Sequence, residues 1–440
     1  MRNHGQENYS DYLSEIKELI ECWELHRTGD LESLVAKMVD MGENLSYKDW
    51  SEARIDFLQQ QLHLITDLET QIRQRLRLGG HLAQLAHWEE AETHYRTALA
   101  DAENLDSEIV LSSVCNKLGA LLLKTNRLSE AESLMRRALS IDETTLGKGH
   151  PSVAASLNNL ATLLQSTNRL SEAEALTRRA LSIDETTMGE GHPSVATSLN
   201  NLAVVLRAMN RLSEAEPLML RALSIDETTL GKGHPSVATS LNNLATLLLE
   251  TDRHSEAEPL MRRALLIGEA FFGKEHPSVA IDLNNLAALL LETDRLSEAE
   301  PLMRRALSID ETSFGESHPT VARDINNLAL LLQATNRLSE AEPLLRRALS
   351  VMETSLGEWN PTVANSLNNL ARLLQATKRL SEAEPLMARA LSIFVEFQKS
   401  TGFEHPNLQD CLKNYRILLK KLGSSNQEIN AKIAELLHSE

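Results

Sequence analysis

The sequence repeats itself at an interval of 42 residues over most of its 440 residues. The string Leu-Asn-Asn-Leu-Ala marks the repeat and begins at Leu157, Leu199, Leu241, Leu283 and Leu367, with Ile325 opening one further copy. A fixed interval of roughly 20–50 residues means that one small supersecondary unit is stacked on its neighbours many times. The repetition therefore predicts a solenoid, in which each unit buries its apolar face against the next.

Each unit contains two helical patterns. In the first, Leu241, Leu244, Ala245 and Leu248 follow the i, i+3, i+4, i+7 spacing of one buried helical face. Asp252 follows this pattern, and aspartate tolerates the left-handed backbone conformation that often ends a helix. The sequence predicts that the first helix ends there.

The second helix of the unit is predicted to open with a capping box, in which Ser255 and Glu258 bond the free backbone N–H groups. Pro259 is expected in its first turn, where a missing N–H costs little. Ala257 and Met261 begin its inward-facing stripe, and a His-Pro pair starts the following unit.

These offsets resemble the tetratricopeptide repeat, a helical hairpin whose pattern of large and small residues is matched here by Leu241, Leu244, Ala245, Leu248, Ala257, Met261 and Ala264. The 42-residue unit is similar to the repeats of kinesin light chains and their bacterial relatives. The resemblance covers roughly residues 75 to 421. It implies an all-α, right-handed superhelical solenoid of about eight to nine hairpins with an N-terminal helical cap.

The chain is expected to divide into three regions. Residues 1–74 form an N-terminal helical region, residues 75–404 the repeat array, and residues 405–440 a degenerate repeat with a polar cap. In the first region an apolar stripe on one long helix is expected, made by Ile55, Leu58, Leu62, Ile65, Ile72 and Leu76. This stripe either packs on the first repeat or joins two chains as a homodimer through residues 47–77.

Composition argues against two classes of partner. The formal net charge of -18 repels phosphate backbones, and only 4% of residues are aromatic, so nucleic acid is not expected to bind. The sequence has no apolar run of about 18 residues, and residues 1–11 are polar. We expect no membrane association and a cytoplasmic location.

No known catalytic or metal-binding motif occurs, so neither an enzymatic activity nor a cofactor is expected. The repeated histidines that precede proline are interpreted as helix caps, because successive copies lie too far apart to share one metal ion. Asn360 fills the same position, as a capping residue could. Glu258 and Arg262, spaced i, i+4, are interpreted as a solvated pair. The three cysteines, Cys22, Cys115 and Cys411, are interpreted as buried thiols.

The paired asparagines are the candidate binding residues. On a helical wheel they point away from the apolar stripe, and we expect them on the inner surface of the superhelix, where amides could bond the backbone of an extended peptide. The resemblance to kinesin light chains implies the same role. The twelve residues are Asn158, Asn159, Asn200, Asn201, Asn242, Asn243, Asn284, Asn285, Asn326, Asn327, Asn368 and Asn369.

The residues beside these asparagines change in charge along the array. Glu250 and Glu292 lie in the middle, whereas Arg323 and Arg372 lie in later repeats and are added to the candidate site. A bound segment is expected to place acidic side chains near the two arginines. The sequence thus predicts a non-catalytic scaffold or adaptor that binds a peptide segment of a protein partner. The alternative is a regulatory subunit that covers a partner enzyme through surface contacts.

Overall fold

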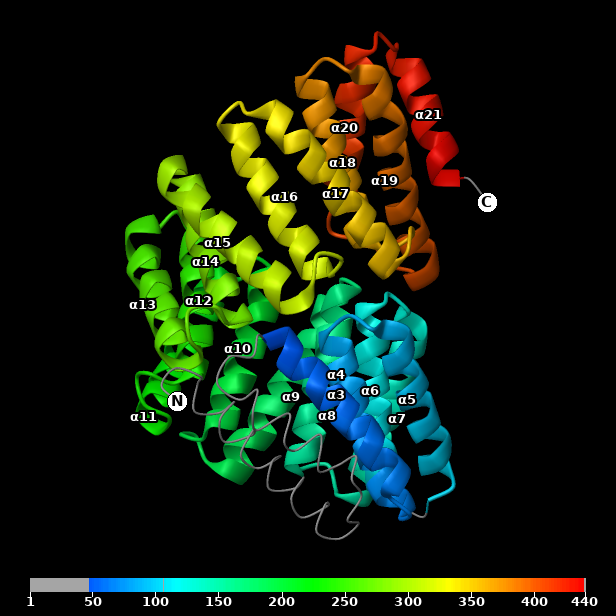
Figure 1. Ribbon diagram of the computed structural model, residues 1–440, viewed down its shortest axis with the longest axis vertical. Helices are drawn as coiled ribbons and strands as arrows, with labels where there is room; N and C mark the ends of the chain where they lie inside the picture. Colours follow the sequence, from blue (N-terminus) through cyan, green and yellow to red (C-terminus); the bar gives the residue numbers. More distant parts are fainter. Residues whose placement is uncertain (1–46, 106, 439–440) are drawn as a thin grey trace.

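The computed structural model describes residues 47–105 and 107–438, and every regular element in these ranges is an α-helix (Figure 1). The N-terminal helices are α3 (Tyr47–Leu64), α4 (Leu68–Gln84), α5 (Trp88–Glu103), α6 (Glu108–Lys124) and α7 (Leu128–Thr145). The middle of the array contains α8 (Pro151–Ser166), α9 (Leu170–Met188), α10 (Pro193–Ala208), α11 (Leu212–Thr229), α12 (Pro235–Glu250), α13 (His254–Phe272), α14 (Pro277–Glu292) and α15 (Leu296–Phe314). The C-terminal helices are α16 (Pro319–Ala334), α17 (Leu338–Leu356), α18 (Pro361–Ala376), α19 (Leu380–Thr401), α20 (Leu408–Lys421) and α21 (Asn426–His438). From α4 to α19 they pack in successive pairs, which confirms the predicted all-α solenoid of helical hairpins.

The turn inside each hairpin is set by one residue with positive φ. In the α12–α13 hairpin this residue is Asp252, with φ of 56°. The N–H of Asp252 bonds the carbonyl of Leu249, and the N–H of Arg253 bonds the carbonyl of Leu248, both at 2.9 Å. These two bonds form a Schellman motif, which satisfies carbonyls that the helix end leaves free. The predicted end of the first helix is confirmed.

The predicted capping box is wrong. Helix α13 begins at His254, and its cap residue Arg253 makes no side-chain cap bond, so Ser255 already lies inside the helix. The Schellman turn fixes Arg253 instead, and its carbonyl accepts bonds from Glu256 and Ala257. For the same reason Pro259 lies in the second turn and not the first. Pro259 has no N–H to bond the carbonyl of Ser255, four residues earlier. That carbonyl faces solvent, because Ser255 is exposed.

The histidine before each repeat proline caps a first helix, as predicted. His276 Nδ1 accepts a bond from Ser278 N at 3.1 Å, and Pro277 is the first helical residue. Asn360 acts in the same way, because its Oδ1 accepts from Thr362 N at 2.9 Å. The same bond is made by His150, His192, His234 and His318. The histidines therefore have a structural role that needs no metal ion.

The core lies between the two helices of each hairpin and between successive hairpins. Leu241, Leu244 and Leu248 on α12 are buried, as are Ala257 and Met261 on α13. Burying each leucine side chain favours folding by about 1.5–3 kcal/mol, and the small alanines let the helices approach closely. The predicted buried stripes of both helices are confirmed.

The array curves with its first helices on the inside. Successive first helices, such as α8 with α10 and α10 with α12, contact one another directly, whereas among the described second helices only α19 and α21 do so to a comparable extent. In a curved stack the elements on the concave side lie closest together. Helices α6 to α18 with even numbers therefore line the inner face, and their odd-numbered partners form the outer face.

The predicted single long helix of the N-terminal region is wrong, because the chain forms two helices, α3 and α4. Asp67 separates them and caps α4, since its Oδ2 accepts from Thr70 N at 2.8 Å. Ile55 and Leu58 on α3 and Ile72 on α4 are buried within the chain. This burial supports packing of the stripe on the first repeats, while the homodimer through residues 47–77 stays a prediction.

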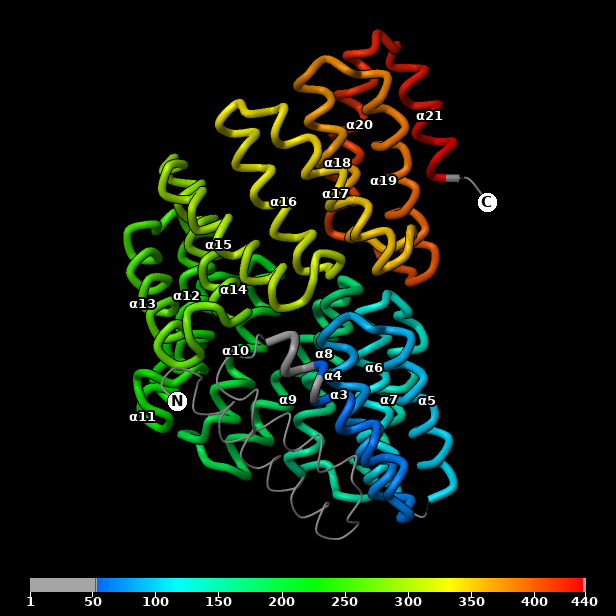
Figure 2. The backbone as a smooth tube through the Cα atoms, in the orientation of Figure 1, coloured from blue at the N-terminus to red at the C-terminus, as the bar shows by residue number. Residues whose placement is uncertain are grey.

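The array turns far enough to contact itself, which the repeats did not predict (Figures 1 and 2). Helix α3 packs against α15, and the side chain of Phe314 joins the N-terminal apolar core. A second contact pairs the α8–α9 turn with the loop after α19. There Asn168 Nδ2 donates to the Glu404 carbonyl at 3.3 Å, and the Arg169 guanidinium lies 5.2 Å from the centre of the Phe403 ring. We call these contacts the seam.

Two of the cysteines, Cys115 and Cys411, are buried free thiols, as predicted. Burial raises the pKa of Cys115 to about 11 and the pKa of Cys411 to about 12. Neither thiol is therefore ionised near neutral pH, and a nucleophilic role for them is disfavoured. Cys22 lies outside the described residues.

Candidate peptide-binding surface

The first asparagine of each pair links consecutive repeats. Asn200 Nδ2 donates to Ser240 Oγ in the next first helix at 2.9 Å, and Ser240 Oγ donates to Asp226 Oδ2 at 2.7 Å. The same Asn–Ser–Asp chain joins Asn158, Ser198 and Asp184. We call this buried chain of bonds the inter-repeat node.

Both amide atoms of the first asparagine are occupied or covered. In Asn158, Asn200, Asn242, Asn284 and Asn326 the Nδ2 donates to the next repeat, and the Oδ1 is buried without a partner among the described atoms. Asn368, in the last copy, accepts from Asn414 at 3.2 Å. These asparagines hold the repeats in register, and a ligand would meet little of them.

In one repeat the aspartate of the inter-repeat node stands on the first helix and not on the preceding second helix, which we call the reciprocal exchange. Asp282 stands where α8, α10, α12 and α18 carry serine, and Gly268 stands where the preceding second helix normally carries aspartate. A Cβ atom at Gly268 would lie only 2.6 Å from Asp282 Oδ2, so the carboxylate fills the space that glycine leaves. Asn242 Nδ2 still donates to Asp282 Oδ1, at 2.6 Å. Burial raises the pKa of Asp282 to about 6.

The next node contains two aspartates that face each other. Asp310 and Asp324 are both fully buried, and Arg323 Nη2 lies 3.8 Å from Asp310 Oδ2 and 3.2 Å from Asp324 Oδ1. Burial, followed by repulsion from Asp324, raises the pKa of Asp310 to about 8. Two carboxyl groups so placed titrate as a pair and share one proton near neutral pH. Arg323 is therefore tied to an internal acidic pair.

This pair predicts that stability falls as pH rises from about 4 to about 8. The folded pKa of Asp310, about 8, lies above its ordinary value of 3.8, so the folded chain holds a proton that the unfolded chain has lost. One such proton changes the free energy of unfolding by up to about 1.4 kcal/mol per pH unit. Asp324→Ser should flatten this dependence, measured as the urea midpoint at pH 5, 6, 7 and 8. The exposed Asp410→Ser change is the control, and an equal slope in wild type and Asp324→Ser would contradict the shared proton.

The second asparagine of each pair is available to a ligand. Asn159 is exposed, and Asn201, Asn243, Asn285, Asn327 and Asn369 are half-buried. Their side chains make no hydrogen bond with other described residues, unlike those of the first asparagines. They recur once per hairpin on the inner face, so the six amides form a row along it. We call this row the asparagine rail.

The residues that flank the rail are accessible, but most of the charged ones have internal partners. Glu250 lies 3.5 Å from Arg207, and Glu292 lies 3.8 Å from His254. Arg372 is exposed and pairs with no carboxylate in the described part of the chain. Of the two arginines predicted in the site, Arg372 is thus the one whose charge is uncompensated.

A ladder of ion pairs, which the sequence patterns did not reveal, connects the second helices of consecutive repeats. Arg295 bonds Glu298 at 2.7 Å and also Glu258 of the preceding repeat at 2.8 Å, while Glu258 pairs with Arg262 as predicted. The arginines hold the pKa of Glu258 below its usual range. The equivalent arginines are Arg169, Arg211, Arg253, Arg337 and Arg379. Each exposed pair contributes little to stability by itself, because water screens it.

Two further findings on the described residues concern membrane-spanning helices and metal sites. Among residues 47–105 and 107–438, no helix is long and apolar enough to cross a membrane. No group of three or more histidine, cysteine, aspartate or glutamate side chains in these ranges could hold a metal ion.

The sequence matches the family model of the tetratricopeptide repeat in overlapping segments that together cover residues 110–394. These segments are 110–186, 174–228, 194–267, 236–312, 283–354 and 320–394. The chain belongs to the tetratricopeptide repeat family.

Solved structures with related folds include a putative kinesin light chain with nearly identical TPR-like repeats from Podosopora anserina. It is 27% identical, with a TM-score of 0.40, and the match covers 47% of this chain and 98% of that one. BtubC (BKLC) from P. vanneervenii is 23% identical over 53% of this chain and 91% of its own, with a TM-score of 0.41. A Rap protein complexed with competence and sporulation factor is 15% identical over 83% of this chain and 99% of its own, with a TM-score of 0.48. No curated protein matches the sequence.

Proposed function

We propose that this protein is a non-catalytic scaffold or adaptor that binds an extended segment of a partner protein along the inner face of its first helices. The asparagine rail carries the proposal. A row of primary amides offers both donors and acceptors at each repeat, which suits the backbone of an extended peptide whatever its side chains.

The contrast within each asparagine pair supports a binding role for the second member. The first asparagine is used in the inter-repeat node, which gives it a structural reason to recur. The second makes no such bond within the described residues, yet it recurs in six consecutive copies. Because its half-buried amide is already partly dehydrated, a peptide bond placed there would replace water at little further cost.

The rail predicts a loss of affinity in the triple variant Asn201→Ala, Asn243→Ala and Asn285→Ala. Each hydrogen bond contributes about 0.5–1.5 kcal/mol, so three lost bonds should weaken binding at least about tenfold. The ligand is a peptide selected from a random library on the full chain, and fluorescence anisotropy measures its dissociation constant.

The matched control removes three hydroxyls from the outer face, one per repeat, at the exposed residues Ser182, Ser224 and Ser308. Their alanine variants should bind as wild type does. An unchanged dissociation constant in the asparagine variant, with its helix content intact, would refute the rail. A loss confined to the serine variant would instead favour a regulatory subunit that covers its partner through outer surface contacts.

A further inference from the structure

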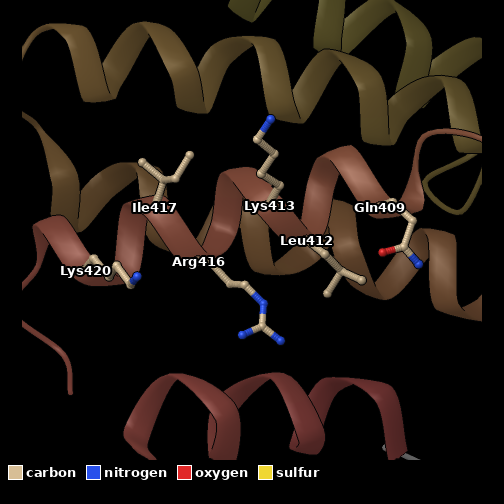
Figure 3. A pocket seen from close by; sticks show the side chains of 6 residues that line it. All are labelled: Gln409, Leu412, Lys413, Arg416, Ile417 and Lys420. Carbon is tan, nitrogen blue, oxygen red and sulfur yellow. The ribbon is translucent and has the colours of Figure 1, made fainter. Parts of the chain in front are cut away.

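The exposed face of α20, the first helix of the last hairpin, differs in sequence from that of the other first helices. Figure 3 shows six of its side chains. A shallow pocket of about 380 Å³ is lined by Gln409, Leu412, Lys413, Arg416, Ile417 and Lys420. Ile417 is 41% exposed, which is unusual for a large apolar side chain in this chain. The face thus combines apolar surface with three basic side chains, and it has no asparagine pair.

The positive charges on this face are uncompensated. Lys413 and Lys420 are exposed and pair with no carboxylate among the described residues. Arg416 donates only to the neutral Asn430 Oδ1, at 3.0 Å. The outer-face arginines, by contrast, are held in the ladder of ion pairs. Unpaired cations gathered in a chain of net charge -18 indicate a surface shaped for an anionic partner.

The preceding first helix adds to the same surface. Helix α18 lies beside α20, because Asn368 bonds Asn414 and Gln375 accepts from Lys421 at 3.4 Å. Arg372 lies on α18 between these two contact points and is exposed. The basic face therefore continues from α20 to the C-terminal end of the asparagine rail.

We propose that α20 and Arg372 form a docking site for an acidic segment of a partner protein, at the C-terminal end of the inner face. One apolar side chain of that segment packs on Ile417 and Leu412. Carboxylates on either side of it pair with Lys413 and Lys420. The proposal rests on the proposed peptide-binding function and adds to it the chemical class of the ligand and the end of the array that receives it.

The test uses the full chain and a fluorescein-labelled dodecapeptide made of two copies of Glu-Asp-Glu-Leu-Glu-Asp. A second dodecapeptide carries lysine at every acidic position. Anisotropy at low salt should show binding of the acidic probe and none of the basic one, with affinity falling as salt is added. Equal binding of both probes, or binding of neither, would overturn the proposal.

Two variants locate the site. Lys413→Glu with Lys420→Glu should weaken binding of the acidic probe at least tenfold, and the glutamine pair should act in the same direction. The control, Lys148→Glu with Lys232→Glu, changes the net charge equally at exposed loop lysines and should alter affinity less than twofold. Equal losses in both pairs would show that only net charge matters, which overturns a local site.

The variant Ile417→Ser tests whether binding of the acidic probe needs an apolar contact in addition to charge attraction. It should weaken the probe at least threefold, but should not weaken a probe whose leucines are replaced by serine. Equal effects on both probes would overturn apolar docking. The asparagine triple variant distinguishes this inference from the proposed function: it tests the rail with the library-selected peptide, so the rail can stand when the acidic site fails.

Discussion

Gly268→Asp is expected to destabilise the array by about 3–5 kcal/mol, the cost typical of an uncompensated buried charge. The new carboxylate would meet Asp282, whose Oδ2 lies 2.6 Å from the position of the added Cβ. In the next repeat a comparable pair, Asp310 and Asp324, has Arg323 beside it, but here Ile281 occupies the equivalent position. Urea denaturation followed by circular dichroism measures the loss.

The same site offers its own rescue. Combining Gly268→Asp with Asp282→Ser recreates the Asp–Ser bond found between Asp184 and Ser198 at 2.6 Å. The double variant should therefore lie within about 1 kcal/mol of wild type, because the bond replaces the repulsion. If the double variant is as unstable as Gly268→Asp alone, the reciprocal-exchange account of this node is wrong.

Phe314→Asp is expected to open the seam without unfolding the hairpins. Phe314 stacks on His318 and packs into the N-terminal core. A carboxylate in its place should therefore reduce the free energy that holds the seam closed by about 2 kcal/mol. Small-angle scattering should show a larger radius of gyration, while the helical circular dichroism signal stays within a few per cent of wild type.

Phe272→Asp is the matched control. Phe272 stands one repeat earlier and stacks on His276 in the same way, but it is not part of the N-terminal core. Its substitution should leave the radius of gyration unchanged. Equal expansion in both variants would mean that the ring supports its own hairpin, and an unchanged radius in Phe314→Asp would show that the seam does not hold the turns together.

The hairpins could be predicted from sequence because their determinants are local. Buried stripes such as Leu241, Leu244 and Leu248 and the left-handed residue Asp252 act over a few residues, and the 42-residue period presents each signal many times. The capping box failed because Ser255 and Glu258 fit the pattern equally well inside the helix. The deciding contact, the Schellman turn at Arg253, involves backbone atoms that the pattern does not report.

The seam and the division of the asparagine pair could not be predicted in the same way. Whether Phe314 reaches the N-terminal core depends on small rotations summed over several hairpins. The helical wheel placed Asn242 and Asn243 on the same face, yet only the first bonds the next repeat. The sequence did contain a signal for the inter-repeat node, namely a constant spacing between its residues. Asp226 precedes Ser240 by 14 residues, and Gly268 precedes Asp282 by the same interval.

Photo-cross-linking tests the central claim, that a peptide lies along the inner face, most directly. Benzoylphenylalanine would replace Ala288, an exposed residue of α14 beside the rail, and in a second variant Leu266, which is 65% exposed on the outer helix α13. Each variant is irradiated with the library-selected peptide bound, and mass spectrometry detects the adduct. The account predicts a covalent adduct from position 288 and none from position 266. An adduct from position 266 alone, at undiminished affinity, would contradict it.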